Sequence, residues 1–333
     1  MFETYENDDE TGSTRGLVTV MIPMLSEDHR KHIQETAKKA GFDCTFCENE
    51  EDARAFLPET EVYFGPGFPL EDRAKKLRWI ALPSAGAEPF TQPGALPEGV
   101  QLTNAAGAYG VTISEHIIMV TLEMMRRRAD YLDIVSRREW RRDLPIRSIH
   151  GARVVIVGTG DIGRETARRI RAFVPEGIIG INRSGVCREP AFDRVLTVER
   201  IEEVLPEADL LILCIPGTPE TSGLLDARRL AMLPEGAYLV NVGRGNCLDE
   251  EALLEMLRTG RIGGAALDVF RQEPLPTDSS MWDAPNLIVT PHISGNMTLR
   301  WTMDRVVQIF TDNLERYGAG EPLTHTVDPG RGY

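Results

Sequence analysis

The chain has 333 residues, enough for two domains, and its 42% apolar and 26% charged content are those of a globular protein. Its net charge of −14 disfavours nucleic acid and anionic membrane as partners, because both need a basic surface. The sequence has neither a bilayer-spanning apolar run nor a signal-peptide pattern, which favours a cytoplasmic protein.

Taken in chain order, the N-terminal region alternates strands and helices, as in a parallel α/β sheet. Residues 1–16 are polar and are expected to fray. Ser26 is placed to cap a helix that stops at Gly41. The region has no glycine-rich phosphate motif, so we interpret it as a substrate-binding domain. The expected strands are Leu17–Ile22, Phe42–Phe46, Glu61–Gly65 and Arg78–Leu82.

The five cysteines are scattered, and an odd number without a secretion signal indicates reduced thiols. Cys44 and Cys47 form a C-x-x-C pair inside a strand-like run, but no second pair of sulfur ligands follows. We therefore expect neither a redox centre nor a zinc site, and no other metal.

A glycine motif, G-x-G-x-x-G, lies between the apolar strand Arg153–Val157 and a helical segment. Its first glycine allows a tight turn, its second lets a pyrophosphate approach the backbone, and its third lets the helix pack on the strand. The free amides at the start of that helix would hold the phosphates. The predicted cofactor-binding residues of this motif are Gly158, Gly160, Asp161, Ile162 and Gly163.

The next strand ends at Asn182, where an enzyme that uses NAD usually has an acidic residue for the ribose 2′-hydroxyl. Arg183, which can pair with a phosphate, and Ser184, a small donor, follow the neutral Asn182. We predict that all three bind the cofactor and that NADP is preferred, with NAD possible. A solvated loop arginine would also explain Arg183.

Further apolar strands complete a doubly wound sheet whose strand ends face one crevice. The helical segments Val111–Arg128 and Met297–Tyr317 are junctions. We therefore expect a discontinuous substrate domain of residues 1–104 and 296–333, and a nucleotide-binding domain of residues 105–295. The added strands are Gly177–Ile181, Leu210–Ile215, Tyr238–Val242, Gly264–Val269 and Leu287–Thr290.

Four loops after strands carry candidates for the chemistry. Arg244, between two glycines, could grip a carboxylate, and His292 could transfer a proton near neutral pH. Asp268 lies in an otherwise apolar strand, and Glu273 lies on a proline-rimmed loop. The small residues of Pro83–Ala87 could expose amides to an anion. Taken singly, Arg244, Glu273, His292 and the Pro83–Ala87 turn each have an ordinary structural explanation, whereas a plain core role does not suit Asp268.

Together these loops resemble the D-isomer-specific 2-hydroxyacid dehydrogenase family, and are most similar to its glyoxylate and hydroxypyruvate reductase branch. The matching stretches are Val240–Gly245, Ala266–Phe270, Glu273–Leu275, Thr290–Ser294, Ile215–Thr221, Ser114–His116 and the closing Val327–Tyr333.

The resemblance implies two Rossmann-like α/β domains with doubly wound parallel sheets and an active site in the cleft between them. It implies that Arg244 and the amides of Ala85–Ala87 bind the carboxylate of a 2-keto acid. Arg244 would also polarise the keto oxygen, and His292, supported by Glu273, would protonate it as hydride arrives. The implied catalytic residues are Arg244, Glu273 and His292, the substrate-binding ones Ala85, Gly86, Ala87 and Arg244, and further cofactor contacts Cys214, Pro216, Thr221, Val242, Asp268 and Gly295.

The resemblance also implies a homodimer in which Trp140 reaches the partner's substrate site, although Trp140 could equally anchor a nearby helix in the core. Two other functions remain open: a dehydrogenase for phosphoglycerate or another D-2-hydroxy acid, and a scaffold like the NAD(H)-sensing corepressor of this family. No single residue fixes the substrate's side chain.

Overall fold

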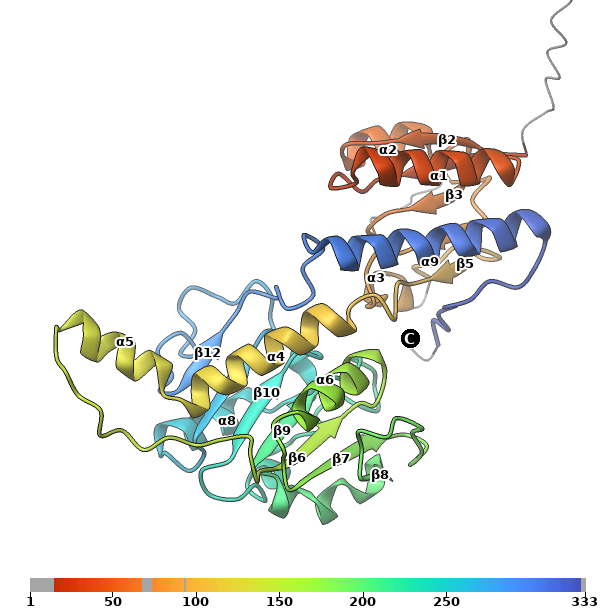
Figure 1. The fold of residues 1–333 in the computed structure, drawn as a ribbon. Coiled ribbons are helices and arrows are strands. Elements are labelled where there is room, and N and C mark those ends of the chain that lie inside the picture. The colour runs from red at the N-terminus through yellow and green to blue at the C-terminus, as the bar shows by residue number, and fades with distance from the viewer. Residues whose placement is uncertain (1–14, 68–73, 93, 331–333) are drawn as a thin grey trace, which may run out of the picture. The chain divides into compact units, whose positions relative to one another are not determined.

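The computed structural model describes residues 15–67, 74–92 and 94–330, which form two compact α/β units (Figure 1). The first unit comprises the described residues up to Ala105 together with Met303–Pro329, and the second runs from Ala106 to Thr302 and includes Gly330. Both sheets are parallel throughout, which confirms the predicted fold class.

Most of the segment expected to fray, and the end of the closing match, residues 331–333, lie outside the described residues. The last two residues of that first segment are held by hydrogen bonds. The amide of Arg15 donates to the Gly41 carbonyl at 2.8 Å, and the amide of Asp43 donates to the Gly16 carbonyl at 3.1 Å.

The first unit has a five-stranded sheet in the order β2-β1-β3-β4-β5. As expected, Ser26 caps α1, and its side chain accepts a hydrogen bond from the amide of His29. The late helix α9 returns to this unit, where Phe310 stacks on Phe64 with ring centroids 3.9 Å apart. The elements are β1 (Leu17–Val20), α1 (Glu27–Lys39), β2 (Asp43–Phe46), α2 (Glu50–Phe56), β3 (Thr60–Phe64), β4 (Trp79–Ala81), α3 (Glu88–Thr91), β5 (Gln101–Thr103) and α9 (Arg300–Ala319).

The second unit has a seven-stranded sheet in the order β12-β11-β10-β9-β6-β7-β8. From β6 the first strands are added toward one edge of the sheet, and from β9 onward they are added toward the other edge. Ligands of such sheets bind beyond the carboxyl ends of the strands at this switch point. Its strands are β6 (Arg153–Val157), β7 (Gly177–Asn182), β8 (Arg194–Thr197), β9 (Leu210–Leu213), β10 (Tyr238–Asn241), β11 (Gly264–Leu267) and β12 (Leu287–Val289). Its helices are α4 (Gly110–Met125), α5 (Arg128–Ser136), α6 (Asp161–Arg171), η2 (Val198–Glu203), η3 (Leu205–Glu207), α7 (Ala227–Leu230), η4 (Gly245–Cys247) and α8 (Glu250–Arg258).

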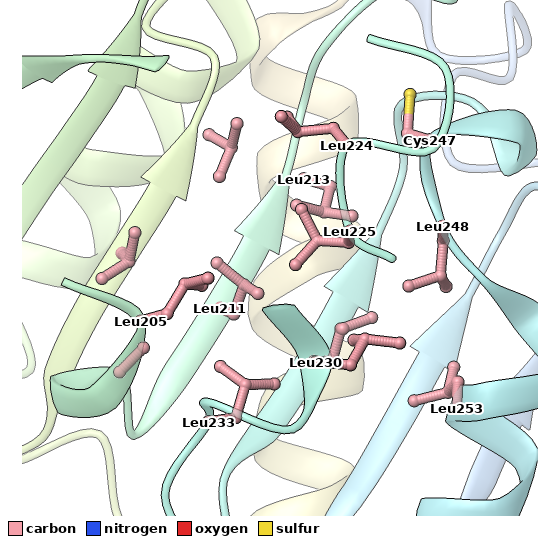
Figure 2. Close-up of a cluster of buried hydrophobic side chains, with 14 of the residues drawn as sticks. Leu205, Leu211, Leu213, Leu224, Leu225, Leu230, Leu233, Cys247, Leu248 and Leu253 are labelled. Atoms are coloured by element: carbon pink, nitrogen blue, oxygen red, sulfur yellow. The ribbon is translucent and has the colours of Figure 1, made fainter. Parts of the chain in front are cut away.

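A leucine-rich core holds this sheet against its helices. Figure 2 shows side chains from β9, α7 and α8 meeting in one cluster. Leu211, Leu213, Leu230 and Leu253 are all 0% exposed. The strands that end at the candidate site are therefore fixed by packing beneath it.

Several elements were not predicted from the sequence, among them α2, β5, β8, α5 and α8. The edge strand β5 has only three residues, too few for a periodic pattern to be detected. The helix expected over Val111–Arg128 ends at Met125, because Arg127 has φ 56°, a left-handed conformation that stops the helix.

Within the described ranges, no helix is long and apolar enough to cross a bilayer. The same residues contain no group of three or more metal-ligating side chains suited to an ion. In the C-x-x-C pair, burial raises the pKa of Cys44 to about 12, with Cys47 adding to the effect, which keeps that thiol protonated.

Candidate active site

The glycine motif forms the turn from β6 to α6, beside the switch point between β6 and β9. Gly158 has φ 100°, and a Cβ there would lie 2.5 Å from the carbonyl oxygen of Cys214. A Cβ at Gly163 would overlap the carbonyl of Gly158. A Cβ at Gly160 would meet no described atom within 4 Å, so the backbone there is open to approach. This geometry fits a dinucleotide phosphate at the start of α6.

Asp161 is the first residue of α6, and its carboxylate bonds to the start of α4. It accepts a hydrogen bond of 2.7 Å from the amide of Gly110, at the start of α4. Asp161 and Ile162 therefore offer a bound phosphate their backbone amides, and the Asp161 side chain fixes the position of α6 relative to α4.

Asn182, at the end of β7, holds the loop that follows it. Its Oδ1 accepts hydrogen bonds from the amides of Ser184 at 3.0 Å and Gly185 at 2.7 Å. Its Nδ2 donates to Thr159 Oγ1 at 2.6 Å and to the Val186 carbonyl at 2.9 Å. The amide thus joins the glycine motif to the loop that carries Arg183 and Ser184, both exposed.

The loop after β9 is tied internally by threonines. Thr221 Oγ1 donates to the Pro216 carbonyl at 2.6 Å and accepts from the amide of Thr218 at 2.8 Å. The amide of Val242, after β10, donates to the carbonyl of Leu213 at 3.1 Å. These residues lie at the carboxyl ends of β9 and β10, as does the predicted cofactor contact Cys214.

Arg244 lies between two glycines that allow close backbone packing. A Cβ at Gly243 would lie 2.6 Å from the Ile215 carbonyl oxygen, and a Cβ at Gly245 would overlap the peptide between Phe270 and Arg271. Neither glycine has a positive φ, so glycine is needed at these positions because a side chain would not fit, and not because of the backbone conformation. The Arg244 loop therefore packs closely against the loops that follow β9 and β11.

Asp268 organises the turn that carries His292. The Asp268 carbonyl accepts from the amide of His292 at 2.9 Å, and its carboxylate accepts from the amides of Ile293 at 2.9 Å and Ser294 at 3.0 Å. His292 has φ 53°, which is uncommon for a residue other than glycine and is stabilised here by these bonds. Asp268 is 2% exposed, so its charge is held inside the protein.

The pKa of the Asp268 carboxyl is below its ordinary value. Burial alone would raise this pKa, but hydrogen bonds from Ser294 and Thr290 and from the amides of the turn favour the ionised form more strongly. Asp268 therefore stays a carboxylate near neutral pH.

His292 and Glu273 form a hydrogen-bonded pair, with Nδ1 of the imidazole 2.7 Å from Oε2 of the carboxylate. Glu273 is itself fixed, because its Oε1 accepts from the amide of Phe270 at 2.9 Å. The side chains are 48% and 36% exposed, so the imidazole can be reached from solvent. An imidazole oriented by a carboxylate is suited to proton transfer.

The sequence did not single out Thr159, Thr290 or His116, which support this arrangement. Thr290 Oγ1 donates to Asp268 Oδ1 at 2.5 Å and lies 3.5 Å from Nε2 of His116. Burial lowers the pKa of His116, an effect opposed by the charge of Asp268. Thr290 and His116 lie in stretches that resemble the family, but no role was assigned to them, and Thr159, inside the glycine motif, carries no signal by itself.

In the first unit, the loop after β4 presents amides. The carbonyl of Ala85 accepts from Asn104 Nδ2 at 2.7 Å, and the carbonyl of Gly86 accepts from Ser84 Oγ at 2.7 Å. Among the described residues, the amides of Ala85, Gly86 and Ala87 donate to no acceptor. Amides arranged in this way can bind an anion.

Two other predicted residues have clear surroundings. A Cβ at Gly295 would lie 3.3 Å from the ring of Tyr109, so this glycine allows close packing on the start of α4. Trp140 is 93% exposed, so the interpretation of Trp140 as a core anchor is wrong.

Comparisons with known proteins agree with this geometry. Residues 118–294 match the family model described as D-isomer specific 2-hydroxyacid dehydrogenase, NAD binding domain. A glycerate dehydrogenase from Methylorubrum extorquens is 32% identical over 260 residues, or 74% of this chain and 77% of that protein.

Two solved structures extend the comparison. A D-isomer specific 2-hydroxyacid dehydrogenase family protein from Aeromonas salmonicida superposes with a TM-score of 0.83 and 33% identity, over 95% of this chain and 100% of the other. The NADPH-dependent glyoxylate/hydroxypyruvate reductase from Sinorhizobium meliloti, in complex with NADP and sulfate, has a TM-score of 0.79 and 27% identity, over 96% and 100%.

Proposed function

We propose that this chain, which belongs to the D-isomer specific 2-hydroxyacid dehydrogenase family, reduces a small 2-keto acid of the glyoxylate or hydroxypyruvate type to the D-2-hydroxy acid. Membership makes it an NAD(P)-dependent oxidoreductase. The observation that carries the proposed proton transfer to a 2-keto acid is the His292–Glu273 pair, with Nδ1 and Oε2 2.7 Å apart at the carboxyl edge of a dinucleotide-binding sheet. The glyoxylate or hydroxypyruvate type is supported by the similarity to the Sinorhizobium reductase.

The roles of the residues follow from their chemistry. The reduced nicotinamide supplies the hydride. Arg244 polarises the keto oxygen and stabilises the negative charge that develops on it. His292, held by Glu273, gives its proton to that oxygen, and in the reverse reaction takes it back. The unengaged amides of Ala85–Ala87 are proposed to receive the substrate carboxylate.

We propose further that NADP(H) is preferred. The Asn182 amide is fully used inside its loop, so β7 ends without an acceptor for the ribose 2′-hydroxyl. Arg183 and Ser184 are exposed beyond it and suit a 2′-phosphate. The Sinorhizobium relative, which also supports this proposal, was solved with NADP.

The exposed apolar side chains of the second unit support a homodimer. On α5 and the segment after it, Leu132 is 48% exposed, Val135 67% and Trp140 93%. Such a surface is costly in a monomer, and a two-fold partner is the commonest way to cover it. We propose that Trp140 contributes to the partner's substrate site. Sedimentation as a monomer at micromolar protein would exclude this arrangement.

The decisive experiment is a panel of 2-keto acids, including glyoxylate, hydroxypyruvate and 3-phosphohydroxypyruvate, assayed with NADH and with NADPH. We expect the highest kcat/KM for glyoxylate or hydroxypyruvate with NADPH. The highest kcat/KM on the phosphorylated acid would contradict the proposed substrate class. Cofactor binding without turnover of any acid would favour a sensing scaffold.

A further inference from the structure

Two successive peptide groups, one on each side of Phe270, fix the loop that presents Glu273. The Phe270 amide donates to Glu273 itself, at 2.9 Å. The Arg271 amide donates to Oε1 of Glu250 at 2.6 Å. Gly245 packs so closely on the peptide between Phe270 and Arg271 that a Cβ would overlap it. The position of Glu273 therefore depends on contacts supplied by the segment that follows Arg244.

That segment is firmly held, from Arg244 to Glu250. Cys247 and Leu248 are 0% and 1% exposed, and Leu248 pairs with Leu225 in an isolated parallel bridge. Asp249 caps α8, accepting from the amide of Ala252 at 3.0 Å. The backbone of Glu250, the first residue of α8, is therefore held in place by this packing and by the cap.

We infer that Glu250 is a positioning residue for Glu273: its carboxylate holds the Arg271 amide and so sets where Glu273 meets His292. The inference rests on the proposed function, because it assumes that the His292–Glu273 pair acts in the reaction. Glu250 itself is not proposed to touch substrate or cofactor.

The electrostatic surroundings of Glu250 agree with this arrangement. Burial raises the pKa of its carboxyl, the amide and charge of Arg271 lower it, and the nearby charge of Glu273 raises it. The two carboxylates are therefore close enough to influence each other, although they bond to neighbouring amides of one loop.

An acidic residue in the first turn of a helix commonly serves only to stabilise the helix. Glu251 provides the matched control, because it is exposed, lies in the same turn, and its side chain makes no hydrogen bond or ion pair within the described part of the chain. Glu251→Ala removes the same charge from the helix start and leaves the loop untouched.

The test compares five variants by kcat, by KM for NADPH and by thermal melting. Misplacement of a reacting group by about 1 Å can cost on the order of 100-fold in rate. We expect Glu250→Ala to lower kcat by about 10- to 100-fold with an unchanged KM for NADPH. Glu250→Gln keeps an oxygen acceptor and should restore most of kcat, and Glu251→Ala should match the wild type.

Glu250→Asp guards against misfolding of the alanine variant, because it keeps the acid at the helix start but shortens its reach. We expect it to melt like the wild type with a reduced kcat. Wild-type kcat in both Glu250→Asp and Glu250→Ala would overturn the inference about Glu250. If His292→Ala were impaired in the same assay, the proposed function would still stand. Wild-type kcat in His292→Ala as well would overturn both.

Discussion

Replacement of Asn182 by aspartate should damage the cofactor loop instead of simply converting the enzyme to NADH. The substitution exchanges Nδ2 for a carboxylate oxygen, which cannot donate. Only the bond to the Val186 carbonyl, at 2.9 Å, must be lost, because two oxygens then face each other there; the Thr159 hydroxyl can turn and donate to the new carboxylate.

The size of the effect follows from those contacts. The lost hydrogen bond costs about 0.5–1.5 kcal/mol before repulsion between the two oxygens is counted. For a unit of about 200 residues, each kcal/mol lowers Tm by roughly 2–4 °C, so Asn182→Asp should lower Tm by about 1–6 °C. Arg183 and Ser184 would lose their fixed positions at the same time.

The assay is a melting curve with kcat/KM for both reduced cofactors, and Arg183→Ala is the control. Arg183→Ala removes a cation without touching the Asn182 bonds, so it should leave Tm nearly unchanged. A charge-assisted phosphate contact is worth about 1.5–3 kcal/mol, so kcat/KM for NADPH should fall by about one to two decades. If Asn182→Asp melted like the wild type and used NADH well, the amide would not support the loop as argued.

Three further outcomes are expected at the proton-transfer site. His292→Ala should lower kcat by about 100- to 10,000-fold at unchanged cofactor affinity, as for loss of a general acid, and near-normal turnover would exclude that role. Glu273→Gln should lower kcat at unchanged cofactor affinity, because a neutral amide no longer holds the imidazole of His292 through a charged hydrogen bond; wild-type kcat would make Glu273 a simple loop residue. Asp268→Asn should lower Tm at pH 7; since the folded pKa of Asp268 is depressed, this difference should begin to shrink only below about pH 4 and vanish once the pH is below the folded pKa. A Tm difference that persisted at acid pH would contradict the charge-based account.

The sequence predicted the features that depend on local order. The glycines of the motif act within one strand–turn–helix unit, so their spacing in the sequence is enough to predict a dinucleotide site. The switch in strand order between β6 and β9 agrees with that prediction. Arg244, Glu273 and His292 were identified because their loops resemble a known family. The structure brings Glu273 and His292 into contact, although they are 19 residues apart.

The supporting residues could not be predicted, because their partners are set by strand order and register. Thr159 and Asn182 meet only because β6 and β7 pair with Val157 beside Ile181. Glu250 reaches Arg271, 21 residues away, only because β10 and β11 are neighbours. Trp140 shows a different limit, since a tryptophan in a sequence looks the same whether it is buried or 93% exposed.

The second unit shows why the supporting residues are polar and the reacting ones exposed. A side chain that meets substrate must reach solvent, so packing of its own atoms does little to fix it. Its loop must then be held through the backbone, and a carboxylate or amide that bonds to backbone groups does this at a defined distance. Asn182 does so for Arg183, Asp268 for His292 and, by our inference, Glu250 for Glu273. A substitution at one of these supports should therefore lower kcat or change cofactor choice even where the reacting side chain is intact.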